Sequence, residues 1–230
     1  MKKTNLKETL QSWKLSNYFR ELSIVIAGVF ITLAGTDYIN RASQEKQIKE
    51  SMQMIKMELK ENLKSINQAE SEYLNEINFF QLLIQKQDSL QTINVSILEN
   101  NINAPFKYTD CEYSEDALEV LKNSALMQQI ANKQFILKLL QAYKGCRKTH
   151  EDNENFYKHK QEHITRYLSR ETSNNPQKTY KDIYEEWEDR LHNHDLKILI
   201  LATPNYFDEN PFTAPQENIK EMIELIDQTY

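Results

Sequence analysis

Glycine is scarce in this chain: only three glycines, Gly28, Gly35 and Gly145, occur among 230 residues. Glycine-rich phosphate-binding loops and the G-x-S-x-G turn of hydrolases need closely spaced glycines, which these positions cannot supply. Nucleotide-binding enzymes and α/β-hydrolases of those types are therefore excluded. Proline is absent before Pro105, so the first hundred residues contain little that would interrupt a helix.

Cysteine is nearly absent as well. Cys111 and Cys146 allow one internal disulfide at most, which excludes a disulfide-rich scaffold. The formal net charge is −6, and because residues 1–20 are basic, residues 21–230 carry about −10. So acidic a domain excludes nucleic acid as a partner. The 12 tyrosines and 9 phenylalanines are enough for a packed core, which argues against general disorder.

One stretch carries no charge at all. It is Leu22–Thr36, 15 residues that lie between Glu21 and Asp37. With its aromatic flanks and Arg20, whose side chain can reach the headgroups, it approaches the bilayer thickness of about 30 Å. It also holds two of the three glycines, and glycine is more frequent in membrane helices than in soluble ones. We predict a transmembrane anchor over residues 21–39, with a buried core helix as the alternative.

The charges on either side of this stretch predict its orientation. Residues 1–20 contain five basic residues and one acidic residue, whereas the charges just after the stretch balance. The more basic flank stays in the cytoplasm. We therefore expect a basic cytoplasmic lead over residues 1–20, the anchor over 21–39 and an extracytoplasmic helical domain over 40–230.

The domain is expected to be all-α. Apolar residues recur at steps of three and four from Ile48 to Ile84, which predicts that the membrane helix continues as one long amphipathic helix to about Gln87. The wide stripe favours packing within the chain over a coiled coil between chains. A polar loop over residues 99–115 then precedes a helical hairpin that turns near Gln128.

C-terminal helices are expected to complete the fold. One should cover residues 179–201, after an exposed linker over 171–178, and another should follow a capping-box pair at Thr213 and Gln216. The run Leu196–Ala202 could be read as a buried strand. Because no partner strand is evident, we assign it to a helix.

Several segments together resemble a known family. They are Glu21 to Gly28, Asn40 and Arg41, Gln44 to Lys64 and Glu119 to Tyr143. The pattern is similar to an uncharacterised family of small bacterial single-pass membrane proteins, known only as a domain of unknown function. The likeness covers the first two-thirds of the chain and departs from the family at Gly35–Asp37. It implies an all-helical, membrane-anchored protein of Gram-negative envelopes and brings no catalytic residue.

Cys111 and Cys146 lie at similar distances on either side of the expected turn near Gln128. In an antiparallel hairpin they come level. A disulfide between them would close a loop of about 35 residues and contribute about 3–4 kcal/mol on the chain-entropy model. It requires the oxidising side of a membrane. Two unrelated free thiols are the alternative.

His159, Glu162 and His163 form the pattern H-x-x-E-H. On a helix the two imidazoles lie one turn apart, a spacing that can bind zinc with the glutamate as general base. A third protein ligand would be needed, and the pattern marks none, though His192 and His194 are available. Partly buried structural histidines are the more ordinary explanation, so we assign no metal, cofactor or catalytic residue.

Three functions remain open. The first is a non-enzymatic scaffold of the bacterial cell envelope, anchored in the inner membrane, that binds a protein partner or itself; Gly28 and Gly35 would then form a close-packing face of the membrane helix. The second is an oligomeric pore subunit, for which the polar residues of the span are Ser23, Thr32 and Thr36. The third is a metal-dependent hydrolase built on the histidine pattern.

Overall fold

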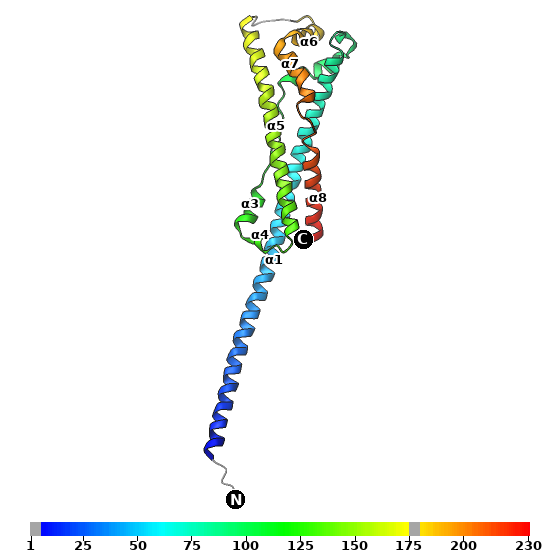
Figure 1. The fold of residues 1–230 in the computed structure, drawn as a ribbon. Helices are drawn as coiled ribbons and strands as arrows, with labels where there is room; N and C mark the ends of the chain where they lie inside the picture. The colour runs from blue at the N-terminus through cyan, green and yellow to red at the C-terminus, as the bar shows by residue number, and fades with distance from the viewer. Residues whose placement is uncertain (1–5, 175–179) are drawn as a thin grey trace. The chain divides into compact units, whose positions relative to one another are not determined.

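The computed structural model describes residues 6–174 and 180–230, with side chains described from Arg20 to Arg170 and from Tyr180 onward (Figure 1). The all-α prediction is confirmed: every regular element in these ranges is a helix. The α-helices are α1 (Leu6–Gln85), α2 (Val95–Asn100), α3 (Asp116–Asn123), α4 (Leu126–Gln129), α5 (Lys133–Asn174), α6 (Ile183–His192), α7 (His194–Ala202) and α8 (Thr213–Thr229), and the 3-10 turns are η1 (Leu90–Thr92), η2 (Ala104–Phe106) and η3 (Thr203–Asn205).

The chain divides into two compact units, Met1–Glu50 and Ser51–Tyr230. In the described part of the first unit, α1 is long and apolar enough to cross a membrane. Its side chains over residues 20–43 are all exposed rather than buried in a core. The hydroxyls of Thr32 and Thr36 donate to the carbonyls of Gly28 and Thr32, at 2.8 and 2.9 Å. The polar groups of the uncharged stretch are in this way partly satisfied by its own helix.

In the second unit, the C-terminal part of α1 packs with α5 and α8 (Figure 1). Most of the predicted apolar stripe forms the core here: Met52, Ile55, Leu59 and Ile66 are fully buried, whereas Leu63, Ile77 and Ile84 are half-buried. Burial within the chain accounts for the stripe without a second copy. The helix ends at Gln85, two residues before the predicted end.

A second cluster of buried residues joins α1 to α2 and α6. Trp187 of α6 is fully buried, and its ring meets Phe79 of α1 with 5.2 Å between the ring centroids. The indole N–H donates to the carbonyl of Leu98 at 3.2 Å. Because the one polar atom of the ring has a partner, the whole side chain can be buried.

Aromatic rings join α1, α5 and the segment before α8. Tyr73 of α1 packs edge-on against Phe156 of α5 at 5.2 Å and against Phe207 at 5.4 Å. Phe212, just before α8, lies 5.8 Å from Tyr73. These contacts fix the path of the chain into α8, which a loop of mostly polar residues would not do alone.

Helix α5 is longer than expected. It runs through Gly145 without a break and ends at Asn174, so the expected linker over 171–178 begins inside the helix, and residues 175–179 lie outside the described part of the chain. Gly145 faces α8: a Cβ at this position would lie 3.4 Å from Cβ of Pro215, which is an ordinary van der Waals contact.

Two expectations about the C-terminal helices were wrong. The single helix over 179–201 is two helices, because the backbone of Asn193 is extended and its side chain accepts hydrogen bonds from Asp195 and Leu196 at the start of α7. The capping box is also absent: Phe212 is the N-cap of α8, and Gln216 bonds to Glu70 of α1 instead. The helical assignment of residues 196–202 is confirmed.

Candidate functional site: a groove between α1 and an extended strap

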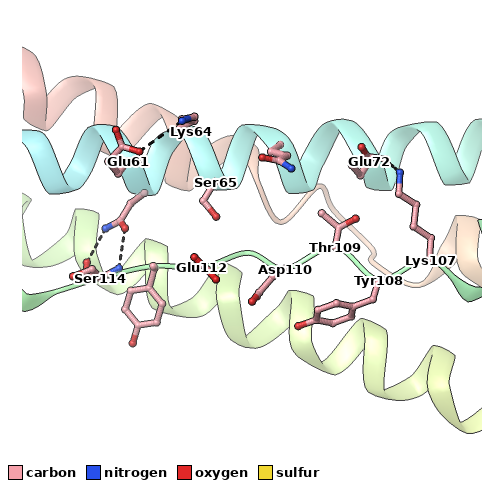
Figure 2. Close-up of a pocket in the computed structure, with 13 residues that line it drawn as sticks. Glu61, Lys64, Ser65, Glu72, Lys107, Tyr108, Thr109, Asp110, Glu112 and Ser114 are labelled. Atoms are coloured by element: carbon pink, nitrogen blue, oxygen red, sulfur yellow. Dashed lines mark hydrogen bonds and ion pairs between the residues drawn. The ribbon is translucent and has the colours of Figure 1, made fainter.

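The polar loop predicted over residues 99–115 contains η2 and then an extended segment, residues 107–115, which we call the strap (Figure 2). Burial alternates along it: Thr109 and Cys111 are buried, whereas Tyr108, Asp110 and Glu112 are exposed. This period of two is that of a β-strand. The strap thus lies inside the predicted loop, and the first arm of the predicted hairpin, between this loop and the turn near Gln128, consists of two short helices, α3 and α4, rather than one helix.

Side chains of the neighbouring helices hold the strap in place. The carboxamide of Asn62 in α1 donates to the carbonyl of Ser114 at 2.8 Å and accepts from its N–H at 2.9 Å. From α5, Asn153 donates to the carbonyl of Thr109 at 3.0 Å, and Nδ1 of His150 lies 2.8 Å from the carbonyl of Cys111. These side chains provide the bonds that a neighbouring strand would otherwise provide.

A buried ion pair fixes the start of the strap. Lys160 of α5 is 1% exposed, and its ammonium bonds to Glu76 of α1 at 2.7 Å and to the carbonyls of Ala104 and Lys107, both at 2.9 Å. Burial lowers the pKa of Lys160 and raises the pKa of Glu76, because each charged form loses hydration. All three ammonium protons nevertheless have an acceptor.

The carboxylate of Glu58 in α1 fixes the other end of the strap. It accepts hydrogen bonds from the Ser114 hydroxyl at 2.7 Å and from the N–H of Ala117 at 3.0 Å, and Tyr143 of α5 donates to its second oxygen. A negative charge beside the first turn of α3 is favourable. Burial and this carboxylate together raise the pKa of Tyr143.

Between α1 and the strap lies a cavity of about 640 Å³ (Figure 2). Four carboxylates and two lysines line it, along with neutral polar side chains; the charged residues are Glu61, Glu72, Asp110, Glu112, Lys64 and Lys107. Both lysines are paired, Lys64 with Glu61 at 3.9 Å and Lys107 with Glu72. The groove therefore has a surplus of negative charge on the strap side, which suits a cationic and polar ligand.

Cys111 and Cys146 are both fully buried and both free thiols in the structure. Cys111 lies in the strap, and its carbonyl meets His150, one turn beyond Cys146 on α5. Burial raises the pKa of Cys146 to about 12, and the nearby Cys111 adds to this shift. Burial likewise raises the pKa of Cys111 to about 11. The two cysteines were predicted to lie close together, and they do so in the structure. The disulfide between them stays a prediction.

If the domain lies in an oxidising compartment, we expect these two thiols to be bonded. Protein taken from membranes and denatured without reductant should then react with no maleimide, and two equivalents should react after reduction. Two reactive thiols before reduction would contradict the prediction. A Cys146→Ser variant is the control, since it should show one reactive thiol in both conditions.

The histidines of the H-x-x-E-H pattern do lie on one face of α5. The rings of His159 and His163 are 4.9 Å apart, and the ring of Tyr206 lies 5.4 Å from His159. Among the described residues, no group of three or more His, Cys, Asp or Glu side chains is placed to hold a metal ion. Glu162 is exposed. The third ligand that the hydrolase hypothesis requires is not supplied by these residues.

Burial of His163 predicts a loss of stability in mild acid. Burial lowers its pKa, as do Arg166 and His159, while Asp195 of α7 and Glu162 oppose the shift. The unfolded chain, with a histidine pKa of about 6.5, then binds a proton more readily than the folded chain. Stability should fall as the pH drops below about 6.5, by at most about 1.4 kcal/mol per pH unit for this group.

Chemical denaturation at pH 7.5 and pH 5.5 measures this effect. A His163→Gln variant should lose less stability between the two pH values than the wild-type chain. The exposed His194 provides the matched control, because His194→Gln should retain the full pH dependence. Equal slopes for His163→Gln and the wild type would refute the assignment.

The glycines proposed for membrane-helix packing, Gly28 and Gly35, lie on an open surface of α1. A Cβ at either position would meet no described atom within 4 Å. Their side of the helix is therefore free to approach another helix, and that packing stays a prediction.

Sequence reasoning missed the residues that hold the strap. A signal was available, because Asn62 lies three residues after Leu59 and four before Ile66, and Glu76 has the same spacing from Tyr73 and Phe80. Polar residues at core-facing positions of an amphipathic helix need a buried partner. Their partners in the strap and in α5 could not be identified from spacing.

Comparisons with protein families, with curated proteins and with solved structures found no match to this chain. The resemblance to a family of single-pass membrane proteins accordingly stays a prediction.

Proposed function

We propose that this chain is a membrane-anchored, non-enzymatic interaction protein of the bacterial cell envelope. Residues 21–39 would cross the inner membrane with the N-terminus in the cytoplasm, and residues 40–230 would form a periplasmic helical domain that binds a protein partner. The observation that carries this proposal is the uncharged, fully exposed stretch Leu22–Thr36 in the same helix that forms the core of the domain.

The continuity of α1 supports a tethering role. Between Gly35 and Gln85 the helix contains neither proline nor glycine, and it is unbroken over this range. The same helix therefore contributes both the uncharged stretch and part of the domain core, so a partner bound to the domain would be tethered to the membrane through α1.

The contacts of the threonines bear on the pore hypothesis. Thr32 and Thr36 donate their hydroxyl protons to carbonyls of their own helix. Such bonds satisfy a hydroxyl in a lipid environment and leave it with less capacity to bind water in a pore. They favour a lipid-facing anchor. For the hydrolase hypothesis, the described residues supply two neighbouring histidines and no third ligand.

Photo-crosslinking in intact cells tests the proposal. A photo-reactive amino acid would replace each of three exposed residues on different elements: Met57 on α1, Tyr108 on the strap and Leu137 on α5. We expect a discrete crosslinked adduct from at least one position, in the membrane fraction. Deleting residues 21–39 should abolish or weaken it.

Two results would overturn the proposal. The first is the absence of an adduct from all three positions. The second is leakage of a small fluorescent dye across the membrane on overproduction of the wild-type chain, because a scaffold should leave the bilayer intact and a pore subunit should not.

A further inference from the structure

The two backbone edges of the strap differ in their partners. In an extended chain, the N–H and C=O groups of one residue point to one edge, and those of the next residue point to the other. The carbonyls of Thr109 and Cys111 bond to Asn153 and His150, so odd-numbered residues face α5. Ser114 bonds to Asn62, so even-numbered residues face α1.

On the α1 side, Ser114 is the one residue of this edge whose backbone is bonded to another described residue. The carboxamide of Asn62 donates one hydrogen bond to the carbonyl of Ser114 and accepts one from its N–H. A residue of a neighbouring antiparallel strand would make the same two bonds. Asp110 and Glu112 come earlier on the same edge. No hydrogen bond joins the backbone of either residue to any group in the described ranges 20–170 and 180–230.

The cavity of about 640 Å³ lies along this unpaired edge (Figure 2). Ser65 and Glu72 of α1 line the opposite wall. The side chains of Asp110 and Glu112 are exposed and add two carboxylates at the rim, while both lysines of the lining are paired with glutamates of α1. The groove therefore combines a row of free peptide groups with uncompensated negative charge.

We propose that the groove between α1 and the strap binds an extended segment of a partner protein that carries lysine or arginine side chains, by pairing it as a strand with the α1-facing edge of the strap. This proposal rests on the proposed interaction function and specifies the surface and chemistry of the partner. Main-chain bonds to Asp110 and Glu112 provide the register, as in other strand-addition complexes. The carboxylates select cationic side chains.

The probe is a fluorescein-labelled hexapeptide of alternating lysine and threonine, titrated with the full chain in detergent micelles and followed by fluorescence anisotropy. One control peptide carries N-methyl groups on alternate residues, which removes the backbone donors of one edge and keeps the charge. A second control has glutamate in place of lysine. We expect saturable binding of the probe, at least about fivefold weaker binding of the N-methylated peptide and no binding of the glutamate peptide.

A matched pair of variants tests the strap itself. Glu112→Ala and Glu112→Pro both remove the carboxylate, but only the proline also removes the N–H on the α1-facing edge, and its backbone angle suits an extended segment. Glu112→Pro should bind the hexapeptide at least about fivefold more weakly than Glu112→Ala. Circular dichroism melting curves show whether both variants fold like the wild type.

Three results would overturn this inference: no saturable binding up to about 1 mM peptide, equal affinity for the N-methylated peptide, or equal affinity of the two folded Glu112 variants. The last two would mean that cationic peptides bind by charge alone. None of these results would affect the crosslinking test of the interaction function, so the two proposals fail separately. As a direct check, the amides of Asp110 and Glu112 should exchange hydrogen quickly in the free chain and slowly with the peptide bound.

Discussion

Replacing Lys160 with methionine should destabilise the domain by about 3–5 kcal/mol, because it leaves a buried carboxylate without its partner. Glu76 is 6% exposed, and the carbonyls of Ala104 and Lys107 lose a donor at the same time. This loss is a large part of the stability of a typical domain. Urea unfolding of the wild type and of Lys160→Met at pH 7.5 measures it.

The pH dependence of the variant distinguishes this cause from lost packing. Without Lys160, the Glu76 carboxyl should be protonated at higher pH, since burial already raises its pKa. The difference in unfolding free energy between the wild type and Lys160→Met should then become smaller as the pH falls from 7.5 to 5.5. The double variant Lys160→Met, Glu76→Met should recover part of the stability, because a matched apolar pair replaces the charges. A loss of unfolding free energy below about 1 kcal/mol in Lys160→Met at pH 7.5 would contradict the stabilising role of this ion pair.

Deleting residues 21–39 should move the chain entirely from the membrane to the soluble fraction. Each Leu, Ile, Phe or Val at the centre of a span favours insertion by about 0.3–0.6 kcal/mol, and the deleted segment contains the whole uncharged stretch Leu22–Thr36. Because the side chains of residues 21–39 contact no core, the shortened domain should keep its melting temperature within a few degrees. Alkaline carbonate extraction followed by immunoblotting measures the partition.

The matched control replaces residues 21–39 with nineteen leucines, which should restore resistance to carbonate. If the deleted chain still resists extraction, another part of the molecule holds it at the membrane. That outcome would contradict the assignment of the anchor.

The long helices could be predicted from the sequence because their signals are local. The stripe from Met52 to Phe80 has no interrupting proline or glycine, and most of it is buried as expected, although Leu63 and Ile77 are only half-buried. The break between α6 and α7 had a local signal as well, since Asn193 is a strong N-cap residue. Because Asn193 lies within a segment whose other residues follow a helical pattern, one continuous helix was predicted.

The strap could not be predicted, because its conformation is set by residues distant in sequence. Asn62 and Asn153 hold it from two different helices, at separations of 52 and 44 residues from their partners. Its own composition, rich in polar residues, is that of an ordinary loop. The capping box at Thr213 failed for a related reason: Gln216 reaches Glu70 of α1, so a tertiary contact replaces the local one.

Topology reporters show directly on which side of the membrane the domain lies. A reporter active only in the periplasm and one active only in the cytosol would be fused, in separate chains, after Tyr230. We predict activity of the periplasmic reporter alone, which would place the strap groove and both cysteines outside the cytosol. Activity of the cytosolic reporter alone would contradict the orientation and assign the groove a cytosolic partner.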